Sequence, residues 1–247
     1  MVQEKCIKME HIVMKRNINI NYILKPYIIY INMYSQCGED KFLNDNFFKN
    51  KKNGTFIELG ALDGVLYSNT KFFEDSLNWH GILIEPNPNT FKLLSKNRSH
   101  NHNYLCNDLV SCYKEPLPYK YFLQQHSAVS GIESTLPPSH NDNYFNKYKF
   151  LPQNTINIIP KSLTTIIQSS YFKHFDLLSL DVEGHEYEIL QSWDFSIPID
   201  IILIEMLENE IKNELCRKLL IKNNYKFICV LSLNEIYILN SSIYDTT

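Results

Sequence analysis

Three apolar runs constrain the fold of this chain more than any other feature. They are GILI (81–84), LLSL (177–180) and IILI (201–204), and none of them alternates with polar residues. A strand without alternation is typical of a sheet that is covered on both faces. Helical patterns separate the runs, which favours right-handed crossovers and a doubly wound, mostly parallel α/β sheet.

Other segments extend this pattern to a seven-stranded sheet with an antiparallel closing strand. The further strands are expected at 55–61, 102–106, 225–232 and 235–240. Helices are expected where apolar residues recur at helical spacing. These lie at 42–50, 67–78, 89–98, 185–193 and 212–224.

The chain is expected to form one domain over 34–247, with residues 1–33 docking on it as an N-terminal segment. A polar, proline-bearing insertion at about 133–160 interrupts the alternation of strands and helices. It is too long for an ordinary connection, so two alternatives stay open: a disordered tether or a lid over a site.

Composition limits the partners and the compartment. A net charge of −3 gives no electrostatic footprint for nucleic acid. Lys25 and Pro26 break the apolar stretch 20–32, so no transmembrane segment is expected. The six cysteines show no metal-binding spacing and no secretory signal opens the chain, which favours free thiols and a cytoplasmic location.

Acidic residues mark the ends of four expected strands. Glu85, Asp181 and Glu205 directly follow the apolar runs, and Glu58 lies near the end of the first strand. Ligands of a doubly wound sheet bind at the carboxyl ends of its strands. A carboxylate beside a buried strand must also be paired or hydrogen-bonded, so four of them predict a binding site.

The glycine spacing distinguishes between two nucleotide cofactors. The loop after the first strand reads E-x-G-x-x-x-G, through Glu58, Gly60 and Gly64, and lacks the G-x-G-x-x-G of dinucleotide sites. S-adenosylmethionine carries no phosphate. Its amino-acid end fits a wider glycine loop beside Glu58, and its ribose hydroxyls fit Glu85. The donor is therefore expected to be S-adenosylmethionine, with an NAD-binding oxidoreductase as an alternative.

Four motifs together resemble the FkbM-type methyltransferases. They are YSQCGEDKFL (34–43), FIELGALDG (56–64), ILIEPNP (82–88) and LSLDVEGHE (178–186), in that order. The resemblance covers about residues 34–240 and implies a Rossmann-like class I methyltransferase that usually O-methylates a sugar, glycan or small metabolite. It implies a donor site with Glu85 at the ribose and Asn107 near the adenine. The other expected donor-binding residues are Gln36, Asp40, Glu58, Gly60, Ala61, Asp63, Gly64 and Asn69.

Three residues are expected to act on the acceptor: Asp181, His185 and Glu205. A hydroxyl acceptor needs positioning and a base, and Asp181 is best placed to be that base. His185 has the alternative role of a helix-start residue facing solvent. Asp181 and Glu205 have the alternative of sharing Mg²⁺, but two acids leave its coordination short, so no metal is expected. A non-catalytic binding subunit of the same fold is a further alternative.

Overall fold

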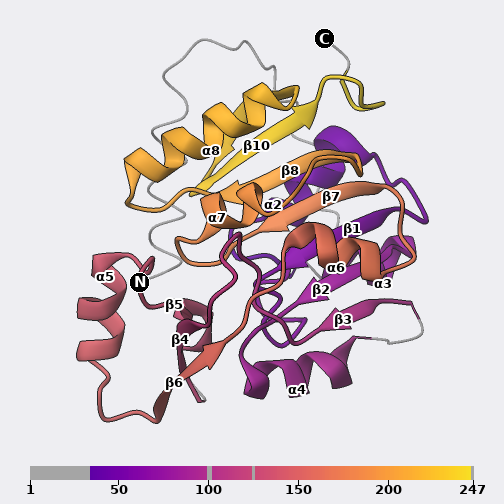
Figure 1. Cartoon of the computed structure of the whole chain (residues 1–247). Helices are drawn as coiled ribbons and strands as arrows, with labels where there is room; N and C mark the ends of the chain where they lie inside the picture. Colours follow the sequence, from indigo (N-terminus) through magenta and orange to yellow (C-terminus); the bar gives the residue numbers. More distant parts are fainter. Residues whose placement is uncertain (1–33, 99–101, 124–125, 246–247) are drawn as a thin grey trace, which may run out of the picture.

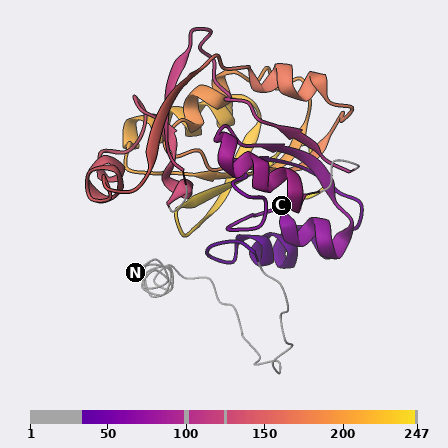
Figure 2. The ribbon, with the colours of Figure 1, turned by 90° about the horizontal axis from the view of Figure 1, so that it is seen from below.

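The three apolar runs form strands of one central sheet. In the computed structural model, which describes residues 34–98, 102–123 and 126–245, they become the strands β2 (His80–Ile84), β7 (Phe175–Leu180) and β8 (Ile199–Glu205). All three are almost completely buried, because helices cover both faces of the sheet (Figure 2). Their lack of alternation is explained by this burial.

The central sheet has seven strands in the order β3-β2-β1-β7-β8-β10-β9 (Figure 1). Its remaining strands are β1 (Thr55–Leu59), β3 (Tyr104–Cys106), β9 (Tyr225–Leu231) and β10 (Asn234–Leu239). Within this sheet, the neighbouring strands β3, β2, β1, β7 and β8 pair in parallel. In contrast, β10 is antiparallel to both of its neighbours. This confirms the predicted doubly wound fold with an antiparallel closing strand. The strand order reverses between β1 and β7, which is where such a sheet binds its ligands.

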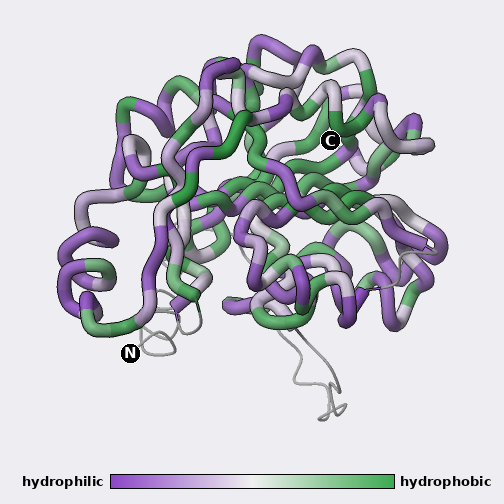
Figure 3. The backbone as a smooth tube through the Cα atoms, turned by 60° about the horizontal axis from the view of Figure 1, so that its bottom comes forward, coloured by the Kyte–Doolittle hydropathy of each residue, from purple (hydrophilic) through white to green (hydrophobic). Residues whose placement is uncertain are grey.

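Two apolar cores hold helices against the two faces of this sheet, and the most hydrophobic backbone lies in its strands (Figure 3). One face is covered by α6 (Leu163–Ser169), α7 (Glu186–Gln191) and α8 (Glu210–Lys222). The other face is covered by α2 (Glu39–Leu43), the π-helix η1 (Asn44–Phe48), α3 (Lys71–Leu77) and α4 (Pro88–Asn97). Every expected helix is present. The helix expected from residue 67 starts only at Lys71, because residues 67–70 form a loop that bonds to Glu58.

A second, three-stranded sheet lies beside the carboxyl ends of the central strands, and we call residues 117–158 the accessory unit (Figure 1). It contains β4 (Leu117–Phe122), β5 (Gly131–Ile132) and β6 (Gln153–Ile158), in the order β5-β4-β6. Between β5 and β6 lie α5 (Pro138–His140) and the π-helix η3 (Asn141–Asn146). The insertion is therefore folded, and the tether alternative is wrong. The sequence did not predict β6. Its polar, partly exposed residues have the composition of a loop, and they form a strand because they pair with β4.

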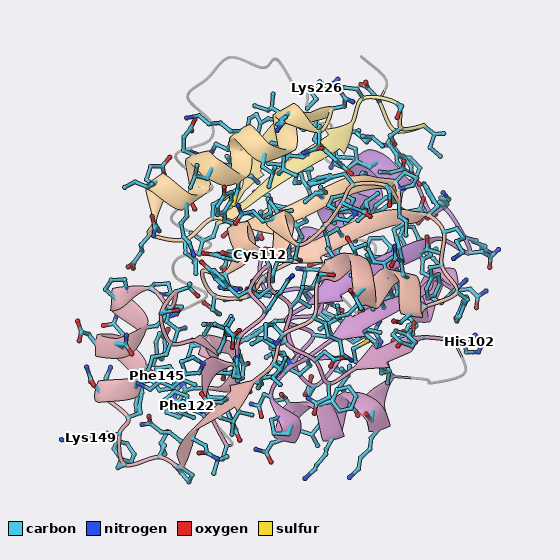
Figure 4. The ribbon with its side chains drawn as sticks, in the orientation of Figure 1. His102, Cys112, Phe122, Phe145, Lys149 and Lys226 are labelled. Atoms are coloured by element: carbon cyan, nitrogen blue, oxygen red, sulfur yellow. The ribbon has the colours of Figure 1, made fainter. Side chains whose placement is uncertain are left out.

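Aromatic rings give the accessory unit a core of its own. Phe122 of β4 stacks on Phe145 of η3 with ring centroids 4.6 Å apart, and the two side chains lie side by side in Figure 4. Lys120 Nζ lies 4.4 Å from the centroid of the Phe145 ring on the same cluster. Offset stacking of this kind fixes the position of η3 relative to the strands.

Three expectations concern the chain outside this framework. Residues 1–33 lie outside the described residues, so their expected docking stays a prediction. Among the described helices, none combines the length and the apolar character that a membrane span requires. Free thiols are found at Cys106, Cys112, Cys216 and Cys229, but Cys37 is disulfide-bonded, so the expectation of free thiols is wrong at that position.

Candidate active site

A cavity of about 810 Å³ lies where the carboxyl ends of the central strands meet the accessory unit. Gly60, Glu85, Asp181 and Glu205 line it from the central sheet, and residues 126–132 and 139–144 contribute to the opposite wall. The volume lies within the range of small-molecule sites. The cavity is at the edge of the sheet that the strand-end acids predicted.

The two glycines of the first loop are required by close packing. Gly60 has φ +78°, and a Cβ there would lie 1.9 Å from the Asp181 carbonyl oxygen. Gly64 has φ +80°, and a Cβ there would lie 2.6 Å from side-chain atoms of both Leu94 and Arg98. Both positions favour glycine for their backbone angle and their space. Gly60 lines the cavity, whereas Gly64 faces α4.

The loop between these glycines presents Leu62 to the cavity. Ala61 is buried and is not among the lining residues. Asp63 points into its own turn, where Oδ1 accepts hydrogen bonds from the amides of Val65 (2.9 Å) and Leu66 (2.8 Å). The structure therefore brings Gly60 and Leu62 to the cavity, but not Ala61 or Asp63.

Glu85 is held rigidly at the end of β2 and lines the cavity. Its Oε1 accepts from the Asn87 amide at 2.8 Å, and its Oε2 accepts from the Leu62 amide at 2.9 Å. The residue is 2% exposed, and this burial raises the pKa of Glu85 to about 7. Each oxygen keeps a free lone pair, which suits a carboxylate that accepts two neighbouring hydroxyl groups.

Glu58 lies behind the loop and does not line the cavity. Its carboxylate accepts hydrogen bonds from Ser68 Oγ, the Asn69 amide and Thr70 Oγ1, and Arg98 Nη1 lies 3.7 Å away. Burial raises the pKa of Glu58, while the Arg98 guanidinium opposes that rise. Glu58 and Asn69 thus support the glycine loop from within the core, at a distance from the expected ammonium contact.

Of the remaining residues expected to bind the methyl donor, one lines the cavity and two do not. Gln36 lines the cavity. Asp40 is fully buried and accepts hydrogen bonds from the amide of Tyr34 (2.9 Å) and the hydroxyl of Ser35 (2.5 Å). Asn107 donates to the Glu85 carbonyl at 2.8 Å, and its neighbour Asp108 lines the cavity in its place.

Three carboxylates converge at the ends of β7 and β8: Asp181, Glu183 and Glu205, which we call the carboxylate cluster. One oxygen of each lies within 4.8 Å of the others. Burial raises the pKa of all three, and mutual repulsion raises those of Glu183 and Glu205 further. Glu183 was not assigned a role from the sequence. Its position two residues after Asp181, in the same loop at the end of an apolar strand, was the available signal.

His185 is 1% exposed, so the solvent-facing alternative is wrong. Its Nδ1 lies 3.2 Å from Thr135 Oγ1 and its Nε2 lies 3.0 Å from Ser111 Oγ. Burial and the nearby Lys212 charge lower the pKa of His185 to about 3, so the ring is neutral at physiological pH. The imidazole borders the cavity and also links α7 to the accessory unit.

The ionisable side chains that line the cavity are mostly acidic. Six carboxylates line it, and among the described lining residues there is no lysine or arginine. The six are Glu85, Asp108, Asp181, Glu183, Glu205 and Glu208. A low-dielectric cleft lined by one sign of charge repels ligands of that sign.

Comparison with known protein families supports a family assignment for this chain. The methyltransferase FkbM domain matches residues 58–227, more than half of the chain. A methyltransferase FkbM from Methylobacillus flagellatus KT is 10% identical, with a TM-score of 0.43, and the match covers 82% of this chain and 51% of that one. A methyltransferase from Pyrococcus furiosus is 10% identical, with a TM-score of 0.41 and 96% of each chain covered. No curated protein matches significantly. On the match of its domain, this chain belongs to the FkbM methyltransferase family.

Proposed function

We propose that this chain transfers a methyl group from S-adenosylmethionine to a hydroxyl group of an uncharged sugar, glycan or small metabolite. The observation that carries the proposal is a small-molecule cavity with Glu85 on its donor side and the carboxylate cluster on its acceptor side. Bound S-adenosylmethionine would supply an electrophilic methyl group on a positively charged sulfur.

The donor side of the cavity fits this cofactor. Glu85 offers a lone pair on each oxygen, at the strand end where a ribose is bound in doubly wound folds. Gly60 keeps the loop close to β7, so the donor lies against backbone and Leu62. The six carboxylates also favour a ligand that carries a sulfonium and an ammonium group.

The acceptor side favours a neutral hydroxyl compound. Phosphorylated acceptors would face the six carboxylates without a compensating lysine or arginine among the described lining residues. The accessory unit contributes hydroxyl and amide groups through Ser127, Ser139, Asn143 and Tyr144. Such groups match the hydroxyls of a sugar.

Asp181 is the proposed base. Bound S-adenosylmethionine would give up its methyl group to the acceptor oxygen as its carbon–sulfur bond breaks, and Asp181 would take the hydroxyl proton. Burial raises the pKa of this carboxyl, which makes its ionised form a stronger base than an exposed aspartate. Its backbone is fixed because the Asp181 amide donates to the Leu59 carbonyl at the end of β7.

Calorimetry with the purified chain tests the donor. S-adenosylmethionine and its demethylated product should both bind, whereas NAD should not. Binding of NAD alone would support the oxidoreductase alternative instead. Donor consumption is then measured with pairs of acceptors, each a neutral sugar and its phosphate ester. We expect turnover of the neutral member; donor binding without any turnover would favour the non-catalytic alternative.

Replacing the proposed base provides the matched test once an acceptor is known. Asp181→Asn keeps the shape of the side chain, so donor affinity should stay close to that of the wild type. Turnover should fall by ~10²–10⁴-fold, the range for losing a positioned base. Glu208→Gln, which removes a different charge from the same cavity, is the control. Near-normal turnover by Asp181→Asn would exclude this residue from proton transfer.

A further inference from the structure

We propose that Asp181, Glu183 and Glu205 together bind one divalent cation, Mg²⁺ or Mn²⁺, inside the cavity. This adds a metal site to the proposed methyl transfer, and its evidence does not depend on the identity of the donor or the acceptor. Oxygen ligands of this type suit hard divalent cations.

The backbone places these three side chains together. Leu180 of β7 is in register with Ile204 of β8, so Asp181, directly after β7, lies beside Glu205, the last residue of β8. Glu183 has φ +60° and Gly184 has φ +99°, which turns the chain sharply after the strand. One oxygen of each carboxylate lies within 4.8 Å of the others. Ligands at roughly 2.0–2.6 Å from a single ion must lie about this close together.

One carboxylate oxygen of the cluster has no donor group beside it among the residues that the structure describes. Oε2 of Glu205 is buried and accepts no hydrogen bond from a donor group of the described residues, and the Glu205 carboxyl contacts only the neighbouring carboxyl of Asp181 at hydrogen-bonding range. It borders a cavity in which the described lining residues include no lysine or arginine. His140 Nδ1 lies 3.3 Å from Glu183 Oε2 and offers at most one donor to the three carboxylates. A buried carboxylate oxygen without a partner is costly, so a ligand of opposite charge is expected there.

A second cluster of ionisable side chains in the same molecule provides a comparison, because its buried acids have partners within the protein. His174, Asp176 and Asp200 also lie within 4.8 Å of one another, at the opposite ends of β7 and β8. There the Thr55 amide and Tyr244 hydroxyl each donate to Asp176 at 2.8 Å, and Lys51 pairs with it. Asp200 lies 2.9 Å from His174 Nε2. Protein groups neutralise that cluster, whereas the carboxylate cluster is left for a ligand.

Lys212 of α8 extends toward the turn after β7, but its charged group already has partners. Its Nζ donates to the Gly184 carbonyl and to Glu188 Oε2, both at 2.8 Å. It therefore supports the turn that carries Glu183 without neutralising the cluster. Two other solutions remain for the cluster, shared protons or an ammonium group of a ligand, and both are outcomes of the test below.

Manganese binding to the full, chelator-treated chain tests the site directly. The electron paramagnetic resonance signal of free Mn²⁺ is followed as protein is added, in the absence of donor and acceptor. We expect one Mn²⁺ per chain and competition by Mg²⁺. Glu183→Gln and Glu205→Gln should each weaken binding by at least about tenfold, because ligand charge sets affinity at such sites. Glu208→Gln, outside the cluster but in the same cavity, should bind Mn²⁺ within about threefold of the wild type.

Thermal unfolding keeps the test decisive if a variant folds poorly. Mn²⁺ should raise the melting temperature of the wild type and of Glu208→Gln, but not that of Glu205→Gln. Absence of Mn²⁺ binding, or equal binding by Glu205→Gln and wild type, would overturn the metal site and leave shared protons or an ammonium ligand. Calorimetry of S-adenosylmethionine with the metal-free protein is run in parallel. Donor binding there would leave the methyltransferase proposal standing even if the metal site fails.

Discussion

At the scale of single residues, two buried glutamates near the same loop have contrasting environments. Glu58 is surrounded by hydroxyl and amide donors and lies 3.7 Å from Arg98. Glu85 has two backbone donors and no ion pair among the described residues, and it faces the cavity. The same residue type therefore supports the fold at one position and is available to a ligand at the other.

The pKa of Glu85 leads to a pH-dependent donor affinity. Burial raises that pKa to about 7, so half of the carboxyl groups are protonated near neutral pH. The ionised form is the better acceptor for ribose hydroxyls, so S-adenosylmethionine affinity should rise between pH 6 and pH 8. Calorimetry across this range measures the effect. Glu85→Gln should bind about 1–3 kcal/mol more weakly, and without this pH dependence. A wild-type affinity that is flat over the range would contradict the assignment.

His185 is predicted to position its neighbours and not to exchange protons. Its pKa of about 3 keeps the ring neutral over the assay range, and both nitrogens lie within hydrogen-bond distance of hydroxyl groups. His185→Gln should therefore lower the free energy of unfolding by about 1–3 kcal/mol. The pH profile of turnover should keep its shape. An acidic limb that disappears in the variant would instead identify His185 as a titrating catalytic base.

At the scale of elements, the turn after β7 is the joint between the central sheet and the accessory unit. A Cβ on Gly184 would lie 2.4 Å from the Thr135 carbonyl oxygen, and His185 contacts the Thr135 hydroxyl. Gly131 also packs against the turn, since a Cβ there would lie 3.4 Å from Glu183 Cβ. The acceptor wall and the carboxylate cluster are thus fixed relative to each other by a few backbone contacts.

Gly184→Ala tests this joint, with Gly38→Ala as its control. Both glycines have positive φ, +99° and +83°, but a Cβ on Gly38 would meet nothing within 4 Å. Each variant should lose about 1 kcal/mol or more from backbone strain. Only Gly184→Ala must also displace Thr135, so it should raise the KM for the acceptor while donor affinity changes little. Equal kinetic effects of the two substitutions would show that the Thr135 contact does not position the acceptor wall.

At the scale of the whole molecule, folding keeps a proton on Glu85 that the unfolded chain releases. The folded pKa of about 7 lies above the unfolded value of 4.5, so this contribution to stability is fully present below pH 4.5. It is lost as the pH rises to 7. The loss amounts to roughly 3 kcal/mol at 1.36 kcal/mol per pKa unit.

Urea unfolding of wild type and Glu85→Gln at several pH values measures this loss. The other titrating groups affect both proteins alike, so the difference between their unfolding free energies isolates Glu85. The variant should gain about 2–3 kcal/mol relative to the wild type between pH 5 and pH 8. A difference that does not change with pH would mean that Glu85 is ionised normally in the folded protein.

The sequence by itself determined the central sheet and the edge of it at which the cavity lies. Apolar runs and helical periodicity are local patterns, so they located the strands of the central sheet, its mostly parallel character and the acids at the ends of β2, β7 and β8. Gly60, Glu85, Asp181 and Glu205 reach the cavity because each lies at or directly after a strand end.

Tertiary structure alone decided how the other residues are used. Glu58 is enclosed by residues 68–70 and by Arg98. These contacts join separate segments of the chain, so no local sequence pattern predicts them. Glu183 joins Glu205 only because β7 and β8 pair in one register and the turn after β7 has positive φ. The accessory unit likewise depends on the pairing of β6 with β4, whose paired residues are more than thirty positions apart in the sequence. Such contacts depend on pairing between distant segments, and their energy is not encoded in either segment alone.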